Sequence, residues 1–137
     1  MKITLAQINF VVGDIEGNKE KIIATAQQSK GSSLVIFSEL SLCGFPPYNL
    51  LDYSDFIERC EKAIDEIAER CDTIPLLIGA PVRNTSGKGK PLFNAAVFLH
   101  QGKRQVFKKK NVGLSNYFEP ADETNILQLS YLHAAEL

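Results

Sequence analysis

The chain alternates short apolar runs with segments of helical periodicity, and this order constrains its fold more than any other feature. Leu34-Val35-Ile36-Phe37 is a continuous apolar run, as found in strands buried on both faces. Residues 2–9 and 75–80 predict two further strands. Between these strands, apolar residues at three-to-four spacing predict helices over 19–29 and 54–70. The order strand–helix–strand–helix–strand predicts an α/β sheet with helices packed on it.

Turn and cap residues divide these elements. Asn18 is expected to cap the first helix and Ser54 the second, because their side chains can accept a free first-turn N–H. Gln101-Gly102 predicts a hairpin between strands at 94–100 and 104–108. Residues 38–53, which include Gly44, Pro46 and Pro47, are expected to form a long loop with some local helical turn. The apolar stripe of the second helix is expected to comprise Phe56, Cys60, Ala63, Ile67 and Cys71.

Composition excludes several classes of protein. Lys and Arg number 15 and Asp and Glu 16, a net charge of -1, so nothing favours a nucleic-acid or anionic-membrane partner. No apolar run reaches the length of a membrane span, and the N-terminus has no secretory signal pattern. The three cysteines then predict reduced thiols in a cytoplasmic protein. We find neither an internal repeat nor a linker, so residues 1–137 are expected to form a single domain.

Side chains just beyond the carboxyl ends of strands tend to converge on a site. Glu39 follows the strand 34–37 and lies among apolar residues. It is either a solvated strand-end carboxylate or a general base whose pKa partial burial would raise. Lys108-Lys109-Lys110 ends the last strand. It is either a solvated basic edge, or one of its lysines turns inward and places a cation opposite Glu39.

Other candidate groups give weaker signals. Cys43 is the cysteine nearest Glu39 in sequence, but nothing beside it lowers its pKa, so packing is the better interpretation. The two histidines lack ligand spacing, so no metal site is expected.

Several passages together resemble the nitrilase-type carbon–nitrogen hydrolase superfamily, and more narrowly the N-terminal glutaminase domain of glutamine-dependent NAD synthetases. The opening Met1–Asn9, followed by Gly13-Asp14, is similar to the family's first strand and helix start. Leu34–Pro47 is similar to the passage that carries the family's base. Ile78–Pro81 followed by Leu92–Ala96 completes the match before Lys110.

The resemblance implies the first half of the family's α-β-β-α sandwich. It implies Glu39 as the general base, Lys110 as the cation beside the oxyanion, and Tyr117 as a residue that touches the substrate, glutamine. The family's cysteine nucleophile and its Cys-Glu-Asp motif are not found in this sequence, so the domain is expected to be incomplete. No cofactor is expected for it, because ATP and Mg would belong to a synthetase domain that this chain lacks.

The resemblance leaves three functions open. The first is glutamine hydrolysis that supplies ammonia for NAD synthesis, with this chain inactive alone because its nucleophile is missing. The second is hydrolysis of another amide or nitrile. The third is a non-catalytic binding or assembly module with the same fold. A half-sandwich also exposes apolar sheet surface, which predicts a homo-oligomer.

Overall fold

A computed structural model gives the structure of the protein and describes residues 1–114 and 116–129. The element order confirms the predicted alternation, β2 has the predicted bounds, and α2 ends at the predicted Arg70. In chain order the elements are β1 (Ile3–Ala6), α1 (Ile15–Gln28), β2 (Leu34–Phe37), the 3-10 helix η1 (Tyr48–Asp52), α2 (Ser54–Arg70), β3 (Leu76–Arg83), β4 (Leu92–His100) and β5 (Lys103–Lys108). Among the described residues, no helix has the length and apolar character needed to cross a membrane.

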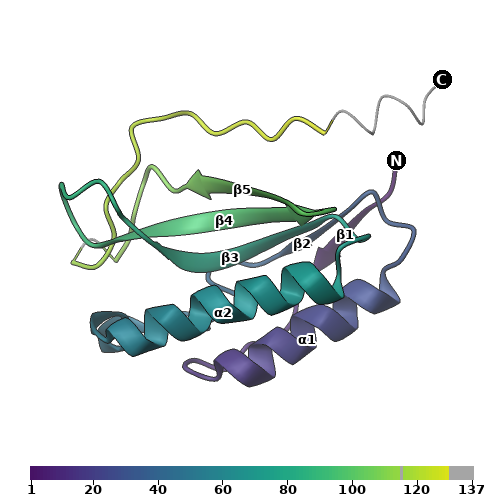
Figure 1. Cartoon of the computed structure of the whole chain (residues 1–137), viewed down its shortest axis with the longest axis horizontal. Coiled ribbons are helices and arrows are strands. Elements are labelled where there is room, and N and C mark those ends of the chain that lie inside the picture. The colour runs from purple at the N-terminus through teal and green to yellow at the C-terminus, as the bar shows by residue number, and fades with distance from the viewer. Residues whose placement is uncertain (115, 130–137) are drawn as a thin grey trace.

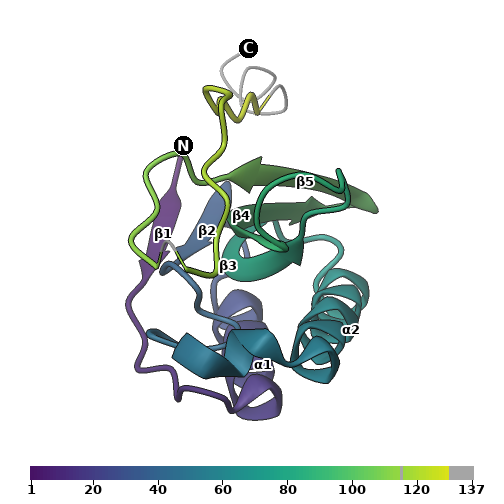
Figure 2. The ribbon, with the colours of Figure 1, turned by 90° about the vertical axis from the view of Figure 1, so that its left-hand side faces the viewer.

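The five strands form one sheet in the order β1-β2-β3-β4-β5. β1, β2 and β3 are parallel, whereas β4 and β5 add antiparallel neighbours. Both helices cover one face of the sheet, and the last described residues, drawn in yellow, run on the opposite side (Figures 1 and 2). The predicted α/β fold is therefore confirmed, with Gln101 and Gly102 forming the turn of the predicted hairpin through positive φ angles of 47° and 74°.

The main core lies between the sheet and the two helices. Strand alternation directs Val35 and Phe37 of β2, and Leu76 and Ile78 of β3, into this core. The predicted stripe of α2 faces them and is confirmed by the burial of all its members. These are Phe56, Cys60, Ala63, Ile67 and Cys71.

The start of α1 differs from the prediction. Asp14, not Asn18, caps the helix, and its Oδ1 accepts the Gly17 N–H at 2.9 Å. Asn18 is fully buried in the first turn instead, where its amide donates to the carbonyl oxygens of Val11 (2.8 Å) and Leu42 (3.1 Å). Sequence position cannot distinguish these roles, because Asn is suited both to a cap and to satisfying buried backbone groups. The predicted Ser54 cap is also wrong, since α2 begins without a side-chain capping bond.

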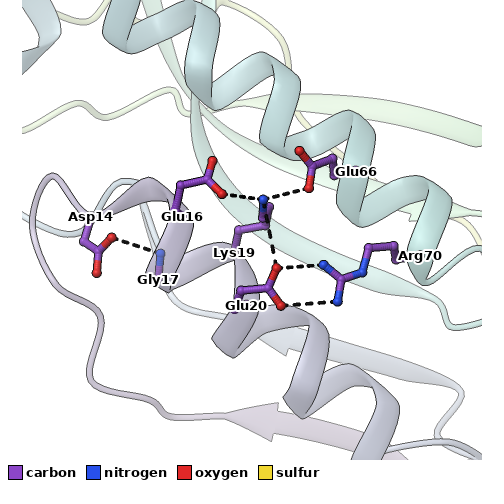
Figure 3. A network of polar contacts seen from close by, with 7 residues as sticks. All are labelled: Asp14, Glu16, Gly17, Lys19, Glu20, Glu66 and Arg70. Atoms are coloured by element: carbon purple, nitrogen blue, oxygen red, sulfur yellow. Dashed lines mark hydrogen bonds and ion pairs between the residues drawn. The ribbon is translucent and has the colours of Figure 1, made fainter.

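A network of charges joins α1 to α2 (Figure 3). The buried Lys19 side chain places its Nζ 2.6 Å from Glu16 and 2.7 Å from Glu66. These hydrogen bonds, first that of Glu16 and then that of Glu66, raise the pKa of Lys19 although burial opposes them. Glu20 and Arg70 form a further ion pair across the same helix contact at 2.7 Å. The carboxylates remain exposed, so Lys19 buries its stem while its charged end reaches partners near solvent.

The sheet face away from the helices carries an apolar row. Leu5 pairs with Ile36, Ile36 with Leu77, and Leu77 with Phe98, so these side chains follow one another across the sheet. Leu5 is 71% exposed, whereas Ile36 and Leu77 are half-buried. Apolar residues aligned in this way on an open sheet face are typical of a surface that packs against another element.

Candidate active site

Glu39 lies in a tight turn that begins where β2 ends, and that turn is bound to β3. The Leu42 N–H donates to the Gly79 carbonyl oxygen at 3.0 Å, and the Gly79 N–H donates to Ser41 Oγ at 3.1 Å. A Cβ atom at Gly79 would collide with backbone atoms of the turn. Glycine at this position therefore allows the turn to lie directly on the strand, which fixes the backbone that carries Glu39.

The residue after Glu39 adds a second constraint. Leu40 has φ of +50° and its side chain is completely buried. Residues other than glycine rarely adopt this left-handed conformation, and it persists where the surroundings over-determine it. Burial of Leu40 in the core thus holds the backbone in a conformation that positions its neighbour, Glu39.

Two donors converge on one oxygen of Glu39. Asn94 Nδ2, from the first half of β4, lies 2.7 Å from Glu39 Oε1. Lys109 Nζ, just after β5, lies 2.7 Å from the same oxygen. The N–H of Lys109 also donates to the carbonyl oxygen of Asn94 at 2.8 Å, so the β4–β5 ladder continues to the site. Strand pairing therefore brings the cation and the amide to the carboxylate together.

The expectation that Lys110 faces Glu39 is corrected by the structure, because Lys109 makes the contact. Lys108 pairs with Ala95, so Lys109 follows opposite Asn94 and projects to the same face as that residue. Lys108 points the other way and places its Nζ 4.4 Å from the centre of the Phe93 ring. Lys110 is exposed and, within the described residues, has no contact with Glu39.

The pKa of Glu39 also differs from the prediction. Burial is the largest influence and acts to raise this pKa, as expected. The hydrogen bonds from Lys109 and Asn94, together with the charge of Lys109, outweigh it, so the pKa of Glu39 lies below its usual value. The Glu39 side chain is 45% exposed, which leaves the carboxylate open on one side. In this arrangement Glu39 is ionised at neutral pH and able to accept a proton.

A cavity of about 350 Å³ adjoins the carboxylate. Glu39, Asn94 and Lys109 supply polar groups to it, and much of the remaining wall is apolar, including Leu77 and Phe107. A pocket of this size with a few convergent polar groups is typical of a small-molecule site. Among residues 1–114 and 116–129, no group of three or more His, Cys, Asp or Glu side chains could hold a metal ion.

Comparison with known proteins assigns the family. The model of the carbon-nitrogen hydrolase family matches residues 2–132. The chain belongs to the carbon-nitrogen hydrolase family. Among curated relatives of this carbon-nitrogen hydrolase chain, the glutamine-dependent NAD(+) synthetase of Aquifex aeolicus is 39% identical over 120 residues, which is 85% of this chain and 20% of the relative. The glutamine-dependent NAD(+) synthetase of Synechocystis sp. is 39% identical over 114 residues, which is 78% of this chain and 20% of the relative.

Solved structures agree with this assignment. A glutamine-dependent NAD+ synthetase from Acinetobacter baumannii, in complex with ADP, superposes with a TM-score of 0.82 at 28% identity, covering 93% of this chain and 25% of the other. An amidase from Nesterenkonia sp. superposes with a TM-score of 0.76 at 19% identity, and the match covers 94% of this chain and 51% of the amidase. The predicted fold, the first half of a nitrilase-like sandwich, is thereby confirmed. This carbon-nitrogen hydrolase chain spans about one fifth of the length of the curated relatives that it matches.

The structure does not bring Tyr117 to Glu39. Tyr117 packs against the core and lines a different cavity, together with Leu51 and Arg83. Its neighbour Phe118 is completely buried and bridges to Leu92. The aromatic pair therefore anchors the segment after Lys109 to β4, away from the carboxylate.

The cysteines of this carbon-nitrogen hydrolase chain are also away from the cavity. Cys43, Cys60 and Cys71 are free thiols buried in the helix-side core, as predicted. Burial raises the pKa of all three, that of Cys60 to about 12. A thiol that stays protonated and shielded cannot attack a substrate at Glu39.

Sequence reasoning missed two features of the site. Asn94 received no role, although its place opposite the last lysines of the hairpin could have signalled one. The choice of Lys110 over Lys109 failed because it rested on resemblance alone. Counting the hairpin register from Gln101-Gly102 would have placed Lys109 opposite Asn94, since side chains alternate faces along a strand.

Proposed function

We propose that this chain carries the base and the cation of a site that hydrolyses the side-chain amide of glutamine, as part of the ammonia supply for NAD synthesis. One observation carries the proposal: Lys109 and Asn94 both bind Oε1 of Glu39 at the edge of a small-molecule cavity. Similarity to glutamine-dependent NAD(+) synthetases supports the choice of substrate.

The chemistry follows from these groups and a thiol. Glu39 takes the proton of the thiol, and the thiolate attacks the amide carbon of glutamine. Negative charge develops on the amide oxygen, and the Lys109 ammonium stabilises it. The protonated Glu39 then gives its proton to the departing nitrogen, which leaves as ammonia. Water, deprotonated by Glu39, hydrolyses the thioester to glutamate and restores the thiol.

The thiol has to come from outside the described residues, because the three cysteines lie in the core on the other side of the sheet. We therefore propose that the chain alone has little or no glutaminase activity. We further propose that no cofactor takes part in these steps, and that ATP and Mg would act only in a synthetase domain. The free thiols support a reducing compartment, the cytoplasm.

A complementation assay tests the proposal. The chain is mixed with a separately produced polypeptide that carries the nucleophile region of the Aquifex aeolicus relative, and ammonia release from glutamine is measured. We expect activity in the mixture only, and Glu39→Gln should lower it by about 100-fold or more. Glu58→Gln, on the exposed face of α2, is the matched control. Absence of ammonia in every mixture would overturn the proposal.

The position of the thiols also supports a second candidate, a non-catalytic binding or assembly module. The apolar row through Leu5, Ile36 and Leu77 could then serve association alone. For either candidate we propose that the chain self-associates through this row, and sedimentation velocity at increasing concentration tests that point. A mixture that binds but never releases ammonia would favour the module. Release of ammonia from another amide, but not from glutamine, would favour a different amidase.

A further inference from the structure

Asn94 connects the base to the cation in two ways. Its side-chain amide donates to Glu39 Oε1 at 2.7 Å, and its backbone carbonyl oxygen accepts the N–H of Lys109 at 2.8 Å. Asn94 is only 5% exposed, in contrast to the half-exposed Glu39 and Lys109 side chains. The most deeply buried of the three residues therefore touches both of the others.

The two oxygens of Glu39 have different surroundings. Oε1 accepts both donors, from Asn94 and from Lys109. Within residues 1–114 and 116–129, no donor lies on Oε2. An oxygen that already accepts two strong hydrogen bonds is a poor place for a proton, because protonation would disrupt both bonds. Oε2 is free of that restriction.

We propose that Asn94 is a positioning residue, whose amide fixes the Glu39 carboxylate so that Oε2 is the oxygen that exchanges protons with groups in the cavity. The proton transfer in this inference rests on the proposed function. The orientation of the Glu39 carboxylate rests only on the hydrogen bonds from Asn94 and Lys109.

Asn94 and Lys109 would then have different roles at Glu39. Lys109 supplies charge, but its long side chain is 39% exposed and is able to leave Oε1 to follow a developing oxyanion. Asn94 is neutral and has only two side-chain torsions, so its hydrogen bond persists when the lysine moves. Glu39 would therefore keep its orientation through the reaction, which is what proton transfer between fixed partners requires.

Carboxyl titration in the isolated chain tests the proposal without any activity assay. The chemical shift of the Glu39 carboxyl carbon is followed by NMR as a function of pH. The scalar couplings of the Glu39 side chain report whether it averages between rotamers. Asn94→Leu keeps the branched shape of the side chain but removes the donor. We expect a raised titration midpoint and an averaged Glu39 rotamer. Lys110→Met, which removes a nearby cation without contact to Glu39, should change neither.

Asn94→Asp provides a second route in case the leucine variant does not fold. It replaces the donor with a like charge at hydrogen-bond distance, so the pair should titrate in two coupled steps, the higher above the midpoint of the unaltered chain. Folded variants with an unchanged Glu39 midpoint and a single rotamer would overturn the positioning role. Failure of the ammonia assay would overturn only the proposed function, because the titration is independent of turnover.

Discussion

Lys109 Nζ lies 2.7 Å from Glu39 Oε1, although the two residues are 70 positions apart in the chain. One residue follows β2 and the other follows β5, and two further strands lie between them in the sheet. The contact exists because the turn after β2 lies on β3 while the β4–β5 ladder continues to Asn94 and Lys109. The sheet therefore assembles a base and a cation that no local segment contains.

Lys109→Met should separate the roles of the neighbouring lysines. Loss of the cation should raise the pKa of Glu39 and lower ammonia release by the complemented enzyme by about 100-fold. Lys110→Met should leave both properties near those of the unaltered chain, because Lys110 is exposed and does not contact Glu39. NMR titration and the ammonia assay provide the two measurements. Equal losses for the two variants would refute the assignment of Lys109.

The lowered pKa of Glu39 makes stability depend on acid pH. The unfolded chain binds the proton at a higher pH than the folded chain, so Glu39 contributes stability above its ordinary pKa of about 4.3. That contribution is lost as pH falls through the lower folded value. Urea unfolding between neutral pH and acid should therefore show a stability advantage over Glu39→Gln that shrinks below about pH 4. A pH-independent difference would contradict the stated direction of the shift.

Gly79→Ala should destabilise the turn that carries Glu39. The added methyl would meet the turn's backbone, which cannot move aside as a flexible side chain could. We expect a loss of about 2–3 kcal/mol in the free energy of unfolding, measured in urea. Gly113→Ala is the matched control, because open space surrounds that position. The control should stay within about 0.5 kcal/mol. Equal free energies of unfolding for the two variants would mean that the close approach of the turn to Gly79 does not contribute to stability.

Lys19→Met should weaken the contact between α1 and α2 (Figure 3). The variant retains an apolar stem but loses the bonds to Glu16 and Glu66, so we expect a loss of about 1–2 kcal/mol in urea unfolding. Lys62→Met removes an exposed pair with Glu58 and should cost less than about 0.5 kcal/mol. A smaller effect at Lys19 than at Lys62 would show that the ion pairs of Lys19 add nothing to stability.

The three thiols should resist modification in the folded chain. Burial shields Cys43, Cys60 and Cys71 and raises their pKa values, so few thiolates are present at neutral pH. A chromogenic disulfide reagent should react slowly with the native chain and quickly with all three thiols in urea. One fast-reacting cysteine under native conditions would identify an accessible thiol and reopen the question of a nucleophile within the chain.

Local patterns predicted the elements that local physics controls. The short apolar run of β2 and the apolar stripe of α2 predicted these two elements, because a continuous apolar run and a three-to-four spacing are both visible directly in the sequence. The caps were less predictable. Asn18 had the chemistry of a cap, yet burial beside Val11 and Leu42 gave its amide other partners.

The sequence alone determined the α/β alternation and the hairpin, since each depends on neighbours along the chain, and it singled out Glu39 as a candidate site residue. Only the tertiary structure decided which lysine meets Glu39 and that Asn94 joins them. It also decided that Tyr117 and the cysteines lie elsewhere. These outcomes depend on strand register and on the packing of one turn against another strand. Shifting that register by a single residue would exchange the two faces of the strand and replace Lys109 with a neighbour.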